Sequence, residues 1–537
     1  MSFSPKFLFF VLLPIQLFAQ TFTSSNLPLV VINTNGQTII DTPKIPASMG
    51  IIWNGPGKRN TLADPKNDFN GNISIEIRGS SSQDMFPKKS YGFETKSIDL
   101  VDMDVSLLGM PQENDWILYA PYTDKTMIRD VLTYTLDASM GHYSPRCRYV
   151  ELFLNNQYQG LYVLMEKIKR DKNRVDVAKL LTTDLTGENL TGGYIVKIDK
   201  TTGGGGDGWY SNYVNSTNNT FYQYDYPKSG EIMAEQKTYI QTYVGNMEKA
   251  LYLGKYSGTG SYHEFLNDTS FIDFMIINEL AKNIDGYRLS SYLYKGKNKL
   301  LNCGPIWDFN LTYGNCNYYN GWTATGFEYQ TDFNGDNWQN PFWWNKLMGD
   351  PAFVLKLKRR WRWIRKHEFS DTRIKFVTDS LVNLISEAQV RNYQHWTGVI
   401  GNYIWPNYYV GTTYASEVTW MKSWITQRLA YLDKMWPYDF TGNDNQLASR
   451  TNMVYPNPIT DQLDVQLAHS VNGYGYAELF NTGGTLIRKS DINIQNGQCQ
   501  FEFSSINILN PGMYVLRIIQ NNNILLTEKV VKGSGGL

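Results

Sequence analysis

An alternation of apolar and polar residues predicts β-strands in the first part of the chain. Ile73, Ile75 and Ile77 occupy every second position, which is the pattern of a strand with one buried face. Short apolar runs bounded by Pro and Gly also occur at residues 29–33 and 45–53. We expect these two runs to form edge strands that frame the start of the main domain.

A further predicted strand, residues 88–94, carries two adjacent lysines. Its alternation puts Lys89 on the same face as Tyr91 and Phe93, and Lys88 on the opposite face. We therefore expect Lys89 to be directed inward, where an ammonium group needs a phosphate or carboxylate partner. The alternative is that Lys89 reaches solvent at the end of the strand.

The segment 150–166 predicts a β-hairpin. Alternating apolar residues lead to the turn Asn155-Asn156, and a strongly apolar strand returns from Gly160 to Glu166. A lone carboxylate is unfavourable at the end of such a strand, so Glu166 needs a partner.

Apolar residues spaced three and four apart predict helices. In the first of them, Arg129 lies off the buried stripe and near the N-terminal end, from where it can reach a neighbouring site. Residues 201–226, which carry four consecutive glycines among many Asn and Ser, predict a surface loop instead. The expected helices cover residues 124–141, 231–253 and 270–283, a segment that starts at Asp350-Pro351, and residues 416–436.

The C-terminal part changes character after residue 437. Residues 438–452 are rich in Gly, Asn, Asp and Ser without an apolar period, which predicts a linker. Short alternating segments follow and predict a small β-sandwich over residues 453–532. The expected strands are 463–467, 474–480, 485–488, 498–503, 513–519 and 524–531.

The N-terminus predicts export. Lys6 precedes an apolar core, and Ala19 is a suitable small residue for cleavage before Gln20, so residues 1–19 are interpreted as a signal peptide. No later stretch has the roughly 20 apolar residues of a membrane-spanning helix. We expect residues 20–437 to form the main domain.

Charge and cysteine content narrow the classes of function. The 537 residues contain 50 Lys+Arg and 50 Asp+Glu, for a net charge of +0, which argues against a nucleic-acid binder. Hydrophobic residues make up 42%, enough for a sizeable core. Of the four cysteines, Cys303 and Cys316 flank Asp308, and in an exported chain their spacing allows a disulfide bond.

Two aspartates are the strongest candidates for chemistry. Asp285 and Asp308 each follow an ordered segment, and Gly304-Pro305 and Gly314 around Asp308 allow the backbone to approach a ligand. One carboxylate that binds metal and a second that acts on a hydroxyl are the requirements of phosphoryl transfer. On spacing alone, turn and capping roles are the more common explanation for both residues.

Five pieces of the chain, in order, resemble the spore-coat CotH kinase family, which has a divergent protein-kinase-like fold. The resemblance covers roughly residues 28–437. The pieces are Arg78-Gly-Ser-Ser with Lys88-Lys-Ser-Tyr91, residues 124–129 with their helix, Gly160-Leu-Tyr to Glu166, Asp285, and Gly304-Pro-Ile-Trp-Asp-Phe-Asn310 with Gly314-Asn315.

The resemblance implies roles for individual residues. Asp285 would align the substrate hydroxyl, and Asp308 would hold Mg²⁺ against the phosphates of ATP, with Mn²⁺ as another suitable metal. Lys89 and Glu166 would line the nucleotide pocket, and Arg129 would support it. Kinase catalytic loops carry a metal-binding asparagine about five positions after the aspartate, and this chain has Ser290 there.

The tail resembles a type IX secretion C-terminal sorting domain. The resemblance rests on Val454-Tyr-Pro-Asn-Pro458, Leu509-Asn-Pro-Gly-Met-Tyr-Val515 and Lys529-Val-Val-Lys532. It implies an interaction with the type IX machinery and a location at the cell surface or outside the cell.

These observations predict an α+β protein with a kinase-like domain followed by a small β-sandwich. The function implied by the resemblance is phosphorylation of Ser or Thr on surface or secreted proteins. The alternative is a catalytically inactive surface module of the same fold that binds protein or glycan.

Overall fold

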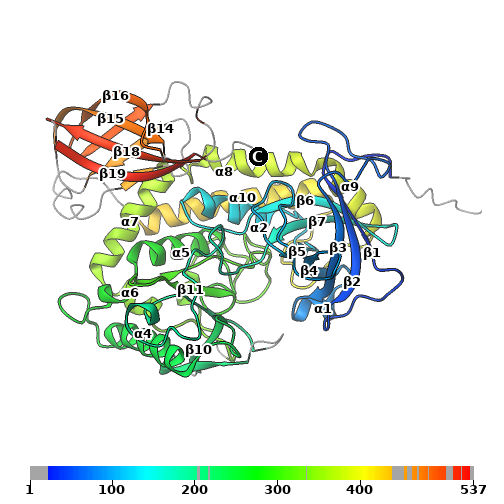
Figure 1. Ribbon diagram of the computed structural model, residues 1–537, viewed down its shortest axis with the longest axis horizontal. Helices are drawn as coiled ribbons and strands as arrows, with labels where there is room; N and C mark the ends of the chain where they lie inside the picture. Colours follow the sequence, from blue (N-terminus) through cyan, green and yellow to red (C-terminus); the bar gives the residue numbers. More distant parts are fainter. Residues whose placement is uncertain are drawn as a thin grey trace, which may run out of the picture.

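The computed structural model describes residues 22–201, 206–215, 218–333 and 335–437 of the main part of the chain, and most of 453–532. The predicted signal peptide, the linker 438–452 and three of the four consecutive glycines lie outside the described residues. Figure 1 shows a β-barrel at one side, a helical layer with a second sheet in the middle, and a small β-sandwich at the other end. The predicted mixture of α and β structure is confirmed.

The first element is a closed barrel, in which β1 pairs antiparallel with β2 and parallel with β6. Ile73 and Ile75 of β3 are buried in its core, as their alternation predicts. The prediction of edge strands at the start of the domain is wrong, because both faces and both sides of β1 are occupied. The strands, in barrel order, are β1 (Leu29–Asn33), β2 (Ile45–Ile52), β3 (Phe69–Arg78), β4 (Ser90–Lys96), β5 (Asp115–Tyr119), β7 (Gln157–Glu166) and β6 (Cys147–Leu154).

A second, five-stranded sheet lies in the middle of the chain. It includes the hairpin of β9 and β10, so the expectation of a surface loop over 201–226 is wrong for most of that segment. In this hairpin the Trp209 ring stacks on Tyr222 and lies tilted against Tyr224, and these contacts stabilise the strand pair. The order is β12 (Leu301–Cys303), β11 (Ser291–Lys295), β8 (Tyr194–Ile198), β10 (Asn218–Tyr226) and β9 (Gly208–Asn215).

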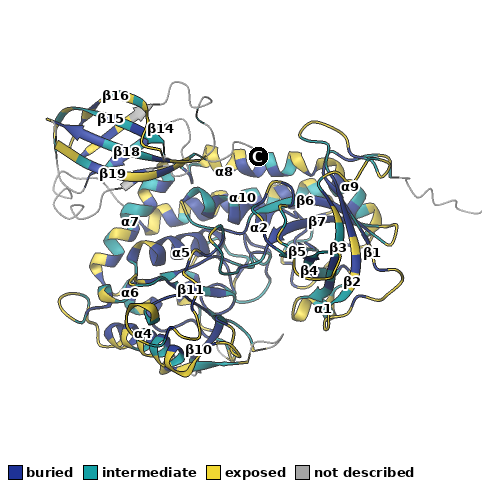
Figure 2. Ribbon diagram, viewed as in Figure 1, coloured by how far each residue is buried: buried dark blue, intermediate teal, exposed yellow. Residues whose placement is uncertain are grey.

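Helices pack between the two sheets and behind them. Helix α5 is buried along nearly its whole length (Figure 2), as expected for a helix that is apolar all round. The Asp350 cap of α7 is confirmed, because its side chain accepts the Ala352 amide at 2.9 Å. The helices are α1 (Ser81–Met85), α2 (Arg129–Ser139), α3 (Gly187–Leu190), α4 (Ala234–Tyr252), α5 (Asp268–Ala281), α6 (Trp343–Met348), α7 (Pro351–Lys366), α8 (Asp371–Leu384), α9 (Ser386–His395) and α10 (Tyr414–Met435), with short 3₁₀ turns at Tyr262–Glu264 and Glu328–Gln330.

Helix α2 begins five residues later than the sequence predicts. Asp124 does not cap a helix directly, because its carboxylate closes a preceding turn by accepting the amides of Thr126 at 2.9 Å and Arg129 at 2.8 Å. The side chains of Ile128, Leu132 and Leu136 are buried, so the predicted stripe is confirmed. The shift brings Arg129 into the first turn of the helix.

The tail has its own core and two sheets. Five of the six predicted strands agree with the structure to within one residue at each end, whereas the strand predicted at 485–488 extends to Ile494 and the strand Met453–Tyr455 was not predicted. Leu463, Val465, Leu479 and Leu516 belong to one buried cluster. One sheet has the order β13 (Met453–Tyr455), β14 (Gln462–Gln466), β17 (Gln498–Glu502), and the other β16 (Leu486–Ile494), β15 (Gly473–Asn481), β18 (Gly512–Gln520), β19 (Asn523–Lys532). Among the described residues, no helix is both long and apolar enough to cross a membrane.

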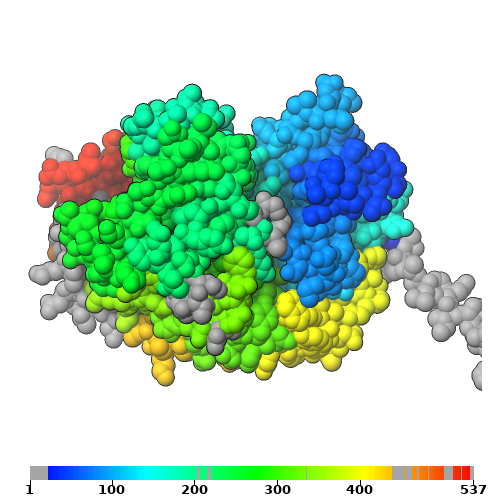
Figure 3. All heavy atoms as spheres, turned by 90° about the horizontal axis from the view of Figure 1, so that it is seen from below, coloured from blue at the N-terminus to red at the C-terminus, as the bar shows by residue number. Residues whose placement is uncertain are grey.

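The main part of the chain has two lobes. We call the seven-stranded barrel the barrel lobe, and the five-stranded sheet with α3 to α6 the sheet lobe. Seen from below, the blue barrel lobe and the green sheet lobe meet along a furrow (Figure 3). Loops from both lobes approach one another near Asp308, where the Arg78 guanidinium of β3 lies 5.5 Å from the Trp307 ring.

Candidate functional site

Asp285 and Asp308, which sequence reasoning singled out, act on each other electrostatically in the structure. Asp285 follows α5, and Asp308 follows β12. Burial raises the pKa of Asp308 to about 8, and the charges of Asp130, Asp285 and Asp199 contribute to the rise while Arg78 opposes it. The charges of three carboxylates from separate elements therefore act on Asp308.

Asp308 has a strained backbone and a free carboxylate. Its φ is +64°, in the left-handed region that non-glycine residues seldom adopt. Its amide donates to the Tyr134 hydroxyl at 3.2 Å, and its carbonyl accepts from Asn283 Nδ2 at 3.1 Å. Within the described residues, the carboxylate itself has neither a hydrogen bond nor an ion pair, so it is available for a ligand.

The first turns of α2 hold the loop that carries Asp308. Asp130 Oδ1 accepts the Phe309 amide at 2.8 Å, and Arg129 Nε donates to the Thr312 carbonyl at 2.9 Å. Burial raises the pKa of Asp130 to about 6, although the hydrogen bond from Phe309 opposes the rise. The other oxygen, Oδ2, is buried without a hydrogen-bond partner among the described residues.

Asp285 is anchored by an ion pair with Arg288. Its Oδ1 accepts from Arg288 Nη2 at 3.1 Å, and Arg288 Nη1 also donates to Asp336 at 2.8 Å. Burial raises the pKa of Asp285, Arg288 and Lys200 oppose the rise, and Asp199 adds to it. One ion pair therefore fixes the orientation of Asp285 and leaves its second oxygen for another donor.

Arg129 lies beneath the Asp308 loop. Its guanidinium is fully buried and pairs with the Asp124 carboxylate while it holds the Thr312 carbonyl. The contacts of this guanidinium are to protein groups, and its support of a nucleotide pocket stays a prediction.

The structure buries Lys88 where the sequence predicts Lys89. Lys88 is 3% exposed, its Nζ donates to the Leu161 carbonyl at 2.6 Å and to Asn392 Oδ1 at 2.9 Å, and burial lowers its pKa well below the usual value. Lys89 is half-buried and donates to the carbonyls of Gln83 and Phe86. The inward direction predicted for Lys89 is wrong because both lysines precede the first residue of β4, Ser90, where the strand alternation does not yet apply.

Glu166 has the partners that its position requires. It is fully buried, and its carboxylate accepts from Arg146 Nη1 at 2.8 Å and from the Arg146 amide at 3.1 Å. The buried Arg174 lies nearby, with Nε 3.8 Å from Oε1. The predicted need for pairing is confirmed, and these arginines occupy the carboxylate.

Two residues of the site were missed by sequence reasoning. Arg78 ends β3, and in the described residues its guanidinium has no ion pair, only the Trp307 ring beneath it. Asp199 directly follows β8 and is part-buried. Both lie at the end of a strand, where loops place functional side chains, but their approach to Asp308 depends on segments that are far apart in the sequence.

The described residues contain no group of three His, Cys, Asp or Glu side chains arranged to hold a metal by themselves. Mg²⁺ is ordinarily held by one or two carboxylates, phosphate oxygens and water, so the donor set around Asp308 fits a metal that arrives with a nucleotide. Cys303 and Cys316 are free thiols, and the bond allowed by their spacing is not formed.

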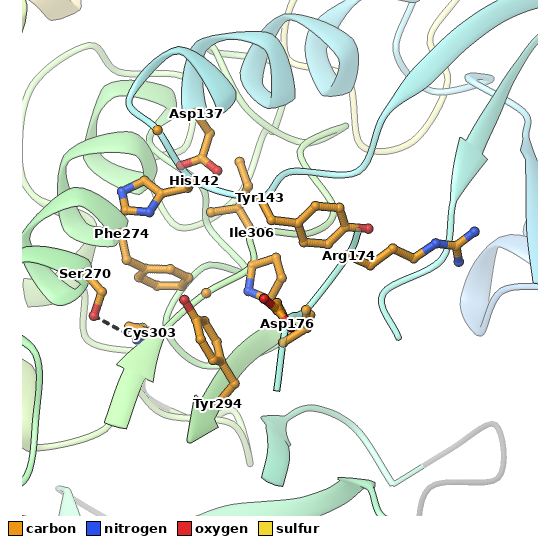
Figure 4. A pocket seen from close by; sticks show the side chains of 14 residues that line it. Asp137, His142, Tyr143, Arg174, Asp176, Ser270, Phe274, Tyr294, Cys303 and Ile306 are labelled. Carbon is orange, nitrogen blue, oxygen red and sulfur yellow. Dashed lines mark hydrogen bonds between the residues drawn. The ribbon is translucent and has the colours of Figure 1, made fainter. Parts of the chain in front are cut away.

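A cavity of ≈ 190 Å³ is separate from the acidic site. Its lining includes Gly304–Ile306, the segment that leads to Asp308, but none of the four aspartates. Figure 4 shows the Tyr294 hydroxyl directed toward this cavity, whereas the Arg174 guanidinium points away from it.

Comparison with protein families gives two matches. The sequence profile described as "CotH kinase protein" matches residues 75–432, and that described as "Secretion system C-terminal sorting domain" matches residues 453–533. The second match indicates export through the type IX machinery to the surface or the medium. No curated protein matches the chain.

Among solved structures, the chain is similar to Pseudomonas fluorescens alkylpurine DNA glycosylase AlkC bound to DNA containing an abasic site analog. The identity is 11%, the match covers 37% of this chain and 56% of that one, and the TM-score is 0.11. A likeness this weak carries no argument about fold or function.

Proposed function

Because the chain belongs to the CotH kinase family, we propose that it is an exported protein kinase with a divergent kinase-like fold. It transfers the γ-phosphate of ATP, with Mg²⁺ or Mn²⁺, to Ser or Thr hydroxyls of surface or secreted proteins. The observation that carries the proposal is the free carboxylate of Asp308 in one acidic site with Asp285. Phosphoryl transfer needs this pair, one carboxylate for metal and one for the acceptor hydroxyl.

We assign a separate role in the reaction to each charged residue of the site. Asp308 holds the metal, which neutralises the charge of the phosphate oxygens. Asp285, oriented by Arg288, accepts a hydrogen bond from the acceptor hydroxyl and aligns it for attack. Arg78 brings a positive charge from the barrel lobe and suits the phosphates, since its guanidinium has no carboxylate partner among the described residues. Lys89, Glu166 and Arg129 remain candidates for shaping the nucleotide pocket.

A second function, binding of protein or glycan without catalysis, is favoured by aromatic residues next to Asp285. The Tyr318 ring stacks on Trp405 with ring centres 5.9 Å apart, and Asp285 raises the pKa of Tyr318 after burial itself. Trp405 and the neighbouring Tyr403 are exposed. A surface formed by these aromatic rings suits the binding of a sugar ring or an extended peptide.

The test measures binding and transfer separately on the full chain. Calorimetry with ATP and Mg²⁺ or Mn²⁺ should show binding to wild type and to Asp285→Ala, and none to Asp308→Ala. Mass spectrometry should show phosphate transfer by wild type, and a loss of about 10²–10⁴-fold in rate for Asp285→Ala. If wild type binds ATP with neither metal, the kinase function is wrong and the binding function replaces it.

A further inference from the structure

We propose that Asp199 is a second metal-binding carboxylate of the site and takes the place of the asparagine whose position Ser290 occupies. This inference rests on the proposed kinase function. It assigns a role to a residue that the kinase motifs do not contain, and it explains how a site without that asparagine retains a second ligand.

The register of the sheet places Asp199 beside Ser290. Strands β8 and β11 are antiparallel neighbours, and their last pair at this end joins Ile198 to Ser291. Asp199 follows Ile198, and Ser290 precedes Ser291, so the two residues leave the sheet at the same edge as adjacent neighbours. The position where the expected asparagine is missing and the additional carboxylate of Asp199 are therefore next to each other in the fold.

The backbone at Asp199 is held firmly from the next strand. Gln223 of β10 is fully buried, and its Nε2 donates to the Asp199 carbonyl at 2.6 Å and to the Lys200 carbonyl at 3.0 Å. A fixed backbone is what a metal ligand needs, because it lowers the entropy lost when the ligand is ordered.

The Asp199 carboxylate keeps an oxygen available. Oδ1 accepts the Lys200 amide at 2.8 Å, while the closest cation to Oδ2 is the Lys197 ammonium at 3.8 Å, beyond hydrogen-bond distance. The side chain is 27% exposed, so a ligand from solvent reaches it.

The charges around Asp308 favour a cation. Asp199 acts on both Asp285 and Asp308, and the buried Asp130 adds an oxygen that no hydrogen bond satisfies in the described part of the chain. The opposing cations are Arg78 at Asp308 and Lys200 and Arg288 at Asp285. A divalent ion held by Asp199 and Asp308 would offset the repulsion among these carboxylates.

The test removes the carboxylate at position 199 and then introduces an asparagine at the adjacent position 290. Mn²⁺ binding to the full chain is followed by electron paramagnetic resonance in the presence of a non-hydrolysable ATP analogue. Asp199→Asn should weaken Mn²⁺ binding about tenfold or more, because the site loses a charged ligand. Adding Ser290→Asn to that variant should restore part of the affinity. The φ of Ser290 is +48°, a conformation that asparagine tolerates well.

The control is Asp225→Asn, which changes a carboxylate in the same sheet. Asp225 acts on Tyr292 but is not among the charges that shift Asp285 or Asp308, so Mn²⁺ binding should be unchanged. A melting curve verifies that each variant is folded. If Asp199→Asn does not fold, Asp199→Ser replaces it in the experiment.

Two results overturn the inference in different ways. If wild type binds Mn²⁺ and nucleotide and the Asp199 variants bind them equally well, Asp199 is not a ligand, and the kinase function stands. If wild type binds no nucleotide with any divalent metal, the kinase function and the inference both fail. Weaker binding that Ser290→Asn partly restores supports the inference.

Discussion

The side chain of Asn283 joins the two candidate catalytic loops through its bond to Asp308. Asn283 Nδ2 donates to the Asp308 carbonyl at 3.1 Å, while Oδ1 of the same amide accepts the Asp285 backbone amide at 3.2 Å. Asn283 is buried, so neither bond competes with bulk water. One side chain thereby sets the separation of the two carboxylates.

This bridge predicts that Asn283→Ala impairs transfer more than it impairs folding. Loss of the bridge leaves a buried carbonyl without its donor and costs about 1–3 kcal/mol of unfolding free energy. Misplacement of the aspartates should lower the rate of phosphate transfer about 10²-fold. Urea unfolding and a single-turnover assay measure the two effects. Asn302→Ala, which removes a hydrogen bond to Asn267 away from the site, is the matched control and should leave the rate unchanged.

The buried pair of Arg129 and Asp124 predicts a strong effect on stability. Both side chains are 1% exposed, so Arg129→Met leaves the Asp124 carboxylate buried without its counter-charge. We expect a loss of about 3–5 kcal/mol in the free energy of unfolding. The double variant Asp124→Asn/Arg129→Met should be more stable than Arg129→Met alone, because no charge is left unpaired. Urea unfolding of Arg129→Met, Asp124→Asn and the double variant would contradict this account if the effects of the two single substitutions simply added.

His142 predicts a pH-dependent contribution to stability. Its Nε2 lies 2.8 Å from Asp273 Oδ2, and although burial alone would lower the pKa of His142, Asp273 and Asp137 raise it above 6.5. A raised pKa in the folded state stabilises the protein below the unfolded pKa, and this contribution is lost as the pH rises through the folded value. His142→Gln should therefore reduce the free energy of unfolding at about pH 6 and change it little at about pH 9.

The control for His142 is a histidine with the opposite shift. Burial and the charge of Lys88 lower the pKa of His395, so His395→Gln should not reduce stability at the lower pH. An equal loss for His142→Gln at both pH values would show that its role is packing rather than charge.

The sequence predicted the strands and helices best where one apolar period dominates. Phe353, Leu357, Trp361 and Ile364 of α7 are all buried, as their spacing indicates. The hairpin of β9 and β10 was missed because its aromatic residues stand among Asn, Ser and Gly, which favour loops. Lys88 was misplaced because the strand begins after it.

In the candidate site, too, local sequence identified some residues and missed others. Asp285 and Asp308 stand next to turn residues, so local sequence identified them. Asp199 and Arg78 join the site through strand pairing and through the approach of the barrel lobe, and contacts between distant segments have no signature in a single sequence. The lack of a bond between Cys303 and Cys316 likewise depends on the positions of β12 and the Asp308 loop, which their spacing does not specify.

We predict that the tail is required for sorting but not for the stability of the main domain. The buried residues of the tail form a cluster of their own, which includes Leu463 and Leu516. Among the described residues, an ion pair from His367 Nε2 to Asp464 Oδ2 at 3.0 Å joins the tail to the end of α7. A single pair that is partly exposed contributes little to stability. Deletion of residues 450–537 should therefore leave the melting temperature of the main domain within a few degrees of its value in the full chain.

The same deletion should stop the protein before it leaves the cell, because the sorting domain is what the type IX machinery engages. Cell fractionation and immunoblotting should find the truncated chain in the periplasm and the full chain at the surface or in the medium. Asp464→Ala is the matched control, since it breaks the contact with α7 and keeps the sorting domain. If the truncated chain still reaches the surface or the medium, the tail is not required for sorting. If it is degraded and its melting temperature falls by tens of degrees, the tail stabilises the main domain through contacts stronger than this ion pair.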